Sequence, residues 1–235
     1  MNCEEHTYSF TVEGPEIEEL VSGEARYFTL TMFSLACFHT ILFHRTLPTL
    51  DFRDGSVSYN SYLGTRDVDC EHLRLAYVCI NSDQLTNKVS NPVRSFADSL
   101  RAEVSATGRE ASGSIVLEFA VHRKGTWGLS SEPSVWERWT ISLTVKSFTP
   151  EDREQHRLQL SEQVREQLLS MLEVVNSPNA YMPSLGSSQL ETEHIIEFSI
   201  PNISPYRFSI TYQSSPNQLR AGMGFAARRL LKYAQ

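Results

Sequence analysis

Residues 135–145 read Val135-Trp136-Glu137-Arg138-Trp139-Thr140-Ile141-Ser142-Leu143-Thr144-Val145. Apolar and polar side chains alternate along most of this stretch, which is the pattern of a β-strand that buries one face. It contains two of the chain's three tryptophans. The third, Trp127, precedes it in a loop rich in Gly, Ser and Pro. We therefore predict a long strand over 135–148, preceded by an irregular loop.

Further strands are predicted on both sides of this stretch, from alternation or from apolar runs bounded by turn residues. They are an edge strand at 8–12, a hairpin at 51–59 around Asp54-Gly55, an interior strand at 73–80, a strand at 114–121 that follows a break at Ser112-Gly113, and two strands at 195–200 and 206–212. The Asp-Gly pair is favoured in tight turns because both residues tolerate a positive φ.

Helices are predicted where apolar residues recur at three- and four-residue intervals between capping signals. They are an apolar segment that ends at His44-Arg45, a helix capped by Ser82 with a kink at Pro92, a helix that begins at Thr149-Pro150 and ends at Asn176, and a last helix at 225–233. No repeat or long linker divides the chain. We predict a single α+β domain, a largely antiparallel sheet with about three helices packed on it.

The composition fits a globular protein and argues against one class of partner. Hydrophobic residues make up 40% of the chain and charged residues 21%, with a net charge of −7. Binding to a nucleic-acid backbone needs an excess of Lys and Arg, so we expect no nucleic-acid partner. The four cysteines form no Cys-x-x-Cys pair, and no leader sequence is recognised, which favours a reducing intracellular compartment.

The segment 27–43 carries no formally charged side chain and is strongly apolar. It is short for a membrane span, which needs about 20 apolar residues. We therefore favour a buried core helix. The alternative is a membrane-associated scaffold held by this segment, with at most peripheral membrane contact.

No motif for catalysis, cofactor binding or metal binding is present at its required spacing. Asp67 and Asp69 would point the same way in an extended chain, and Gly222-Met223-Gly224 precedes a helix that contains Arg228. These features leave a nucleotide-dependent enzyme as an alternative, although we favour a solvated pair of acids and a helix-dipole contact as their explanation. We expect no enzyme activity, no cofactor and no metal, and we favour an interaction module.

Trp127 is the first candidate contact for a partner, because a tryptophan among turn residues has little neighbouring apolar surface to cover it. Trp is also enriched among the residues that dominate binding energy at interfaces. The alternative is that Trp127 folds back onto its own domain.

Several segments resemble, in order along the chain, the autophagy-related protein 101 family. They are Met1-Asn2-Cys3, Val12-Glu13-Gly14, the run 39–45, the run 64–70, Val135 to Thr140, Leu172 to Asn176, Pro205-Tyr206 and Ala227 to Lys232. The resemblance implies one HORMA domain over 1–235 without catalytic activity. It also implies a cytoplasmic subunit of the ULK-type kinase complex that acts at the phagophore assembly site. The implied partner is the HORMA domain of autophagy-related protein 13, which it binds and stabilises as a heterodimer.

The family pattern also places a recruiting finger, in which a Trp and a Phe project from the loop before the Trp-rich strand. By position the finger loop is 123–134, and its tip is Trp127-Gly128-Leu129. Leu129 replaces the aromatic residue and Gly128 adds flexibility, so recruitment of downstream autophagy factors is expected to rest on Trp127.

The heterodimer face is predicted at Phe43-His44-Arg45, where polar groups follow an apolar helix. The simpler role for His44 and Arg45 is to cap that helix and meet its negative end. The sequence also departs from the family by extra length at about 21–33, either a lineage insertion or an unspliced intron, which transcript sequencing distinguishes.

Overall fold

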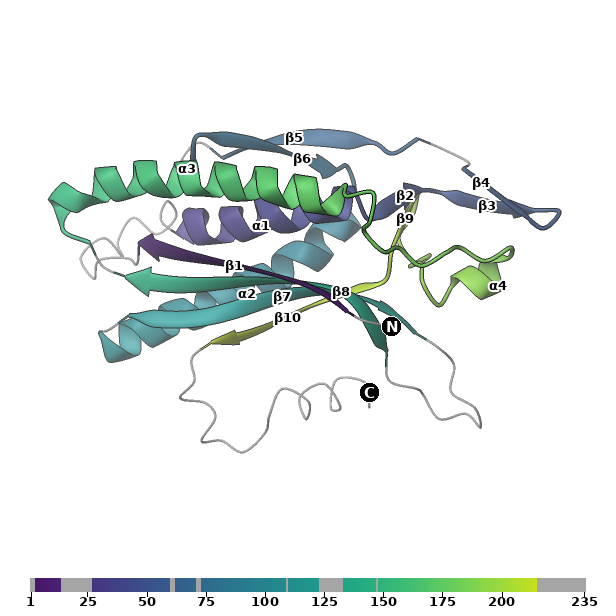
Figure 1. The fold of residues 1–235 in the computed structure, drawn as a ribbon. Coiled ribbons are helices and arrows are strands. Elements are labelled where there is room, and N and C mark those ends of the chain that lie inside the picture. Colours follow the sequence, from purple (N-terminus) through teal and green to yellow (C-terminus); the bar gives the residue numbers. More distant parts are fainter. Residues whose placement is uncertain are drawn as a thin grey trace, which may run out of the picture.

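The computed structural model describes residues 3–13, 27–59, 62–70, 73–108, 110–122, 133–146 and 148–214 (Figure 1). In these ranges the elements are β1 (Glu4–Glu13), α1 (Tyr27–Phe43), β2 (Thr46–Pro48), β3 (Leu50–Arg53), β4 (Ser56–Tyr59), β5 (Thr65–Cys70), β6 (Leu75–Ile80), α2 (Asp83–Thr107), β7 (Ala111–Val121), β8 (Ser134–Lys146), α3 (Pro150–Val175), α4 (Gln189–Thr192), β9 (Ile203–Pro205) and β10 (Phe208–Ser214). The predicted helix at 225–233 and the interval 14–26 lie outside the described residues.

The main sheet has the strand order β1-β8-β7-β10. β7 pairs antiparallel with both β8 and β10, whereas β1 pairs parallel with β8, from Glu4–Glu137 to Glu13–Lys146. The Trp-rich stretch therefore forms β8, an inner strand of the sheet. The other pairs of strands, β2–β9, β3–β4 and β5–β6, are short antiparallel ladders. The predicted α+β class with a mainly antiparallel sheet is confirmed.

Three helices cover one face of this sheet (Figure 1). α1 contacts α2 and α3 on its two sides, α2 packs on β7 and β10, and α3 runs along β1. The β5–β6 hairpin lies against α1 on the side away from the sheet. α1 is consequently enclosed on all sides, which explains why its sequence shows no polar face.

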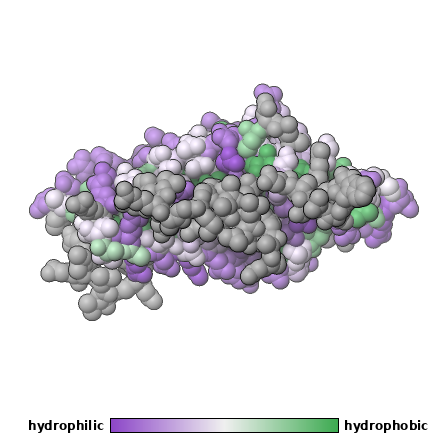
Figure 2. All heavy atoms as spheres, turned by 90° about the horizontal axis from the view of Figure 1, so that it is seen from below, coloured by the Kyte–Doolittle hydropathy of each residue, from purple (hydrophilic) through white to green (hydrophobic). Residues whose placement is uncertain are grey.

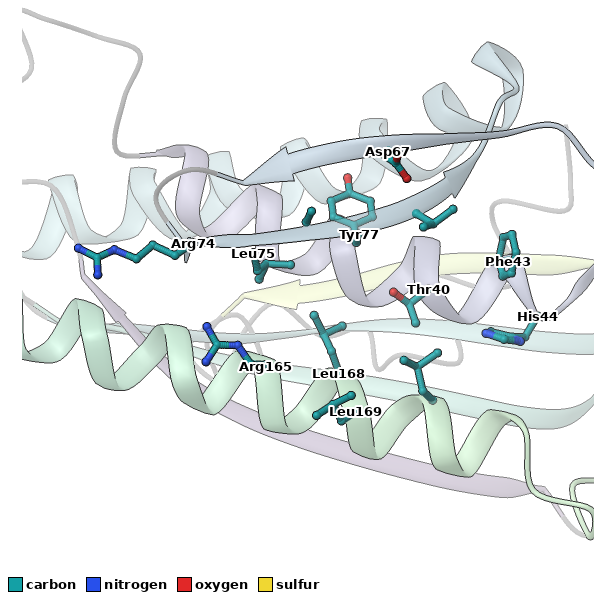
Figure 3. A pocket seen from close by; sticks show the side chains of 13 residues that line it. Thr40, Phe43, His44, Asp67, Arg74, Leu75, Tyr77, Arg165, Leu168 and Leu169 are labelled. Carbon is teal, nitrogen blue, oxygen red and sulfur yellow. The ribbon is translucent and has the colours of Figure 1, made fainter.

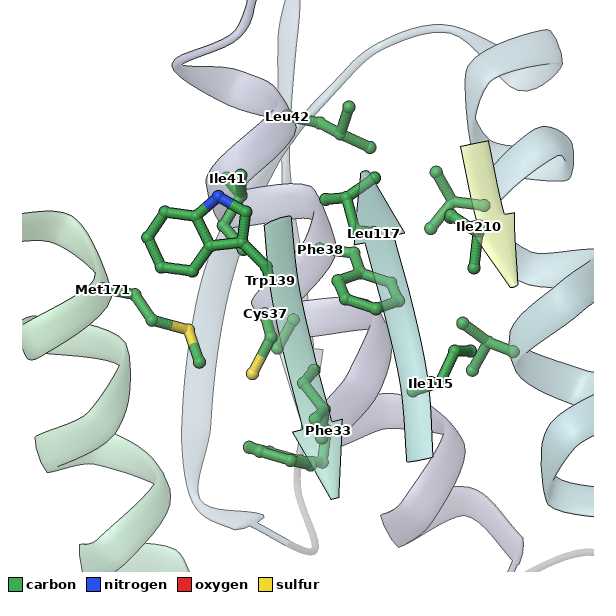
Figure 4. Packing of buried hydrophobic residues seen from close by; sticks show 14 of the residues in the cluster. Phe33, Cys37, Phe38, Ile41, Leu42, Ile115, Leu117, Trp139, Met171 and Ile210 are labelled. Carbon is green, nitrogen blue, oxygen red and sulfur yellow. The ribbon is translucent and has the colours of Figure 1, made fainter. Parts of the chain in front are cut away.

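The core forms where α1 meets the sheet and α3 (Figure 4). Side chains of α1 such as Phe38 and Ile41 are fully buried, between Leu117 and Trp139 of the sheet and Met171 of α3. The predicted core helix at 27–43 is confirmed for its described side chains. None of the helices in the described ranges has the length and hydropathy to span a membrane.

Alternate residues of β8 face opposite sides of the sheet, as the pattern predicts. Trp139, Ile141, Leu143 and Val145 are buried towards the helices, whereas Thr140, Ser142 and Thr144 between them are partly exposed. In the view from below the sheet, hydrophilic residues occupy much of the visible margin (Figure 2).

Local capping signals set the ends of the helices as predicted. The Ser82 hydroxyl accepts a hydrogen bond from the backbone N–H of Leu85 at the start of α2, and the Thr149 hydroxyl accepts one from Asp152 at the start of α3. α2 continues through Pro92 to Thr107, and Gly108 ends it with a φ of 62°. At the predicted β3–β4 turn, Asp54 and Gly55 both have positive φ.

Three predictions for strands were wrong. The strand at 73–80 is not interior, because β6 pairs within the described residues only with β5, and Val78 is 41% exposed. The segment 195–200 is not a strand and makes a single bridge, between Ile196 and Tyr206. Ser112-Gly113 does not break the chain but lies inside β7, where Gly113 lets α2 approach closely.

A groove between the β6 strand and helix α3

The candidate site is an open groove of about 560 Å³ between the β5–β6 hairpin and α3, above the C-terminal end of α1 (Figure 3). We refer to it as the groove. Its lining residues are Thr40, Phe43 and His44 of the α1 end, Asp67, Arg74, Leu75, Ala76, Tyr77 and Val78 of the hairpin region, and Arg165, Leu168, Leu169 and Leu172 of α3.

The periodicity of each element decides which of its side chains are buried and which line the groove. α3 buries Leu160, Val164, Leu168, Met171 and Val175, at intervals of three and four residues, against the domain. Leu169 is off this stripe and points into the groove instead (Figure 3). On β6 the strand alternation leaves Ala76 and Val78 exposed while Tyr77 and Cys79 are buried.

Several apolar side chains that line the groove are exposed. Leu169 is 57% exposed and Val78 is 41% exposed, and the partly buried Phe43 lies at one end. Contiguous exposed apolar surface rimmed by polar groups marks sites where proteins bind one another.

Charged side chains occupy the rim of the groove. Arg74 and Arg165 lie at one end, whereas Phe43 and His44 lie at the other (Figure 3). Asp67 lies on β5, towards the Phe43 end (Figure 3). Arg74 has a φ of 47°, a conformation that is uncommon for residues other than glycine.

Two of the residues predicted for a heterodimer face, Phe43 and His44, come together at the groove. Their rings meet edge to face, with centroids 5.2 Å apart. Burial, followed by the charge of Arg45, lowers the pKa of His44. A neutral imidazole beside an aromatic ring leaves Asp67 as the charged lining residue towards this end of the groove near neutral pH.

Arg45, the third predicted face residue, points into the domain. Its Nε and Nη2 atoms donate to Oε2 and Oε1 of Glu137, each at 2.8 Å, and both side chains are 2% exposed. Its Nη1 atom donates to the carbonyl of Val175, at 3.1 Å. Arg45 thus meets the negative end of α3, and its Nη1 atom also donates to the carbonyl of His44, just after its own helix, at 3.3 Å.

The remaining candidate residues are not part of this arrangement. Trp127, Gly128 and Leu129 lie outside the described residues. The paired residues Val121 and Ser134 mark where the finger loop 123–134 joins neighbouring strands. Asp67 and Asp69 are exposed on β5, and the described part of the chain holds no group of three His, Cys, Asp or Glu side chains suited to a metal ion.

Sequence reasoning missed the α3 and β6 walls of the groove. The usable signal was Leu169, an apolar residue off the predicted buried stripe of its helix, because an exposed leucine there has no role in the core. Val78 gave no such signal. Apolar residues on both faces of a strand predict that both faces are covered, and only the tertiary structure shows that the face carrying Val78 is not.

Known proteins are similar to this chain along its length. The sequence profile of a family described as Autophagy-related protein 101 matches residues 10–189, which include every element that lines the groove. The chain is 31% identical to Autophagy-related protein 101 of Xenopus tropicalis over 234 residues, covering 99% of this chain and 98% of that protein. Proteins of the same name from Xenopus laevis and Homo sapiens are 30% and 29% identical, with the same coverage.

Proposed function

The chain belongs to the autophagy-related protein 101 family, and from this premise we propose that it is a non-catalytic adaptor of autophagy initiation. Its partner is the HORMA domain of autophagy-related protein 13, which it binds and stabilises as a heterodimer. It acts in the cytoplasm and at the phagophore assembly site, as a subunit of the ULK-type kinase complex. The observation that carries the proposal is the groove, an exposed apolar surface that includes Phe43 and His44.

The groove is suited to binding a folded partner because hydrogen bonds and an ion pair join the elements that form its walls. α3 and the hairpin are joined by Ser161, whose hydroxyl donates to the carbonyl of Leu73. The Arg45–Glu137 pair fixes the far end, where α1, β8 and α3 converge. A preformed surface loses little conformational entropy on binding, which favours affinity. In this proposal Phe43 and His44 contact the partner, and Arg45 positions them.

The first experiment measures heterodimer formation by size-exclusion chromatography with light scattering. We expect a one-to-one complex with the HORMA domain of autophagy-related protein 13 at micromolar concentration. Leu169→Asp places a charge in the groove and is expected to weaken the complex by roughly tenfold or more. Separate elution of the two unmodified proteins would reject the proposal.

Leu158→Asp is the matched control, because Leu158 is also exposed on α3 but does not line the groove. It is expected to leave the affinity unchanged. If both substitutions weaken the complex equally, the groove is not the binding face. Thermal unfolding of each variant alone distinguishes lost binding from lost folding.

Recruitment of downstream autophagy factors is proposed to use Trp127, with Gly128 and Leu129 forming the rest of the finger tip. Trp127→Ala should leave the heterodimer intact and reduce capture of downstream factors from a lysate that contains the assembled kinase complex. If the variant instead fails to fold, Trp127 belongs to the core of its own domain. Leu129→Phe tests the same idea in the opposite direction, since a second aromatic anchor is expected to strengthen recruitment.

A further inference from the structure

Positive and negative side chains lie towards opposite ends of the groove. Arg74 and Arg165 lie at one end, and Asp67 lies towards the other (Figure 3). Asp67 pairs with Val78 in the β5–β6 ladder, and Arg74 lies four residues before Val78. At about 3.4 Å per residue, the backbone positions of Asp67 and Arg74 are separated by about 14 Å along the hairpin.

Among the described residues, the cationic end of the groove has little opposing charge. Within the described residues, Arg74 has no ion-pair partner, and Arg165 pairs only with Glu162, one turn away on the same helix. Both partners of that pair are about half exposed, so the pair leaves the Arg165 guanidinium accessible. Two arginines at the same end of an apolar groove make that end attractive to an anion.

Asp67 also has no ion-pair partner among the described residues, although it is exposed beside the apolar wall. A bound segment that covered the groove with apolar side chains alone would remove solvent from all three charges and offer them no new partner. Complementary charges at both ends avoid this cost and fix the direction in which the segment lies.

We infer that the groove binds a segment of the partner protein that is apolar in its centre, carries a carboxylate at the Arg74–Arg165 end and carries a cationic side chain at the Asp67 end. This inference rests on the proposed function, because it names the chemistry of the partner at the same face. The separation of about 14 Å corresponds to about four residues of a strand or about nine residues of a helix. Arginine at the first end favours a carboxylate because its fork can donate two hydrogen bonds.

Charge reversal tests the inference with the intact heterodimer. Affinity for the HORMA domain of autophagy-related protein 13 is measured at low and at moderate salt for the double variant Arg74→Glu, Arg165→Glu. We expect a loss of roughly tenfold or more at low salt, mainly through slower association, and a smaller loss when salt screens the charges. Asp67→Lys should weaken binding in the same manner.

Arg94→Glu is the control for reversing one positive charge elsewhere on the surface, and it is compared with Arg74→Glu and Arg165→Glu made singly, because Arg94 is exposed on α2 and does not line the groove. It is expected to leave the affinity within about twofold. An equal loss in Arg94→Glu and in the groove variants would overturn the inference, since overall charge would then explain the effect. Unchanged affinity in the groove variants, combined with a loss in Leu169→Asp, would overturn the inference and leave the proposed function standing. Absence of any heterodimer with the unmodified chain would reject both.

Discussion

Arg45 and Glu137 form a bidentate ion pair inside the domain, although they are 92 residues apart in the sequence. The same guanidinium donates to the carbonyl of Val175, the last residue of α3. One side chain therefore joins the end of α1, the Trp-rich strand β8 and the end of α3. Because these are the elements below the Phe43 end of the groove, the pair links core packing to the geometry of the candidate site.

Removing one partner of this pair is expected to destabilise the domain strongly. Arg45→Met leaves the Glu137 carboxylate buried without its cation, and such changes typically cost about 3–5 kcal/mol. The measurement is the free energy of unfolding from urea denaturation. The double variant Arg45→Met, Glu137→Leu removes both charges and should recover much of the loss. Equal stability of the single and double variants would show that the buried charge is not the cause.

Acidic pH is expected to destabilise the domain through His39. This histidine is 3% exposed and stacks on Tyr77, with ring centroids 6.0 Å apart. Burial, followed by the charge of Arg66, lowers the pKa of His39 from 6.5 to about 4. Since the unfolded chain binds a proton that the folded chain excludes, stability is complete above pH 6.5 and falls as the pH drops towards about 4. The loss attributable to His39 is up to about 3 kcal/mol.

His39→Leu isolates this contribution because it removes the titrating group and keeps an apolar side chain. Urea denaturation at several pH values should show a shallower loss of stability between pH 6.5 and 4 in the variant than in the unmodified chain. The absolute stability at neutral pH is a separate quantity, since leucine packs differently against Tyr77. An unchanged pH dependence would mean that other groups, and not His39, set the acid response.

Ser161 is expected to control both stability and the shape of the groove. Its hydroxyl is buried and donates to the carbonyl of Leu73, the residue before Arg74. Ser161→Ala leaves that carbonyl without this donor, at a typical cost of about 1–3 kcal/mol. We expect weaker heterodimer formation as well, because α3 then loses its link to the hairpin. Gln159→Ala, at an exposed position of the same helix, is the control, and a loss of the same size there would contradict a specific role for Ser161.

The predictable part of the fold is the part set by local sequence. The alternation of β8 and the caps at Ser82 and Thr149 each depend on neighbouring residues, and each matches the structure. The segment 195–200 has the same alternation, but tertiary contacts limit it to one bridge between Ile196 and Tyr206. Propensity sets what a segment can form, and packing sets what it does form.

Residues of the candidate site could be proposed from the sequence only where they lie close together in a single element. Phe43 and His44, at the end of an apolar helix, were proposed from the sequence as partner contacts, and both line the groove. The contact of Arg45 with Glu137 spans 92 residues, so no local pattern indicates it. For the same reason no local pattern places Arg74 and Arg165 at one end of the groove, since one lies beside β6 and the other on α3.

Gly113 is expected to be intolerant of any side chain because α2 packs directly against β7 at this position. A Cβ atom there would lie 2.6 Å from the carbonyl oxygen of Gln213 and 2.8 Å from the ring of Phe96. The first contact is with backbone of the paired strand β10, which cannot move without disturbing the ladder. Gly113→Ala should therefore destabilise the domain by about 1–3 kcal/mol, measured by urea denaturation.

Gly64→Ala is the matched control for Gly113→Ala. A Cβ atom at Gly64 would meet only Asn81, at an ordinary contact distance of 3.8 Å. The same substitution there should be neutral or stabilising by up to about 1 kcal/mol, because alanine restricts the unfolded chain more than glycine does. Opposite signs at the two positions would show that close approach of α2 and β10, rather than loss of glycine as such, limits β7. A neutral Gly113→Ala would instead require that α2 can shift away from the sheet, and Phe96 and Leu100 would then lose packing against β7.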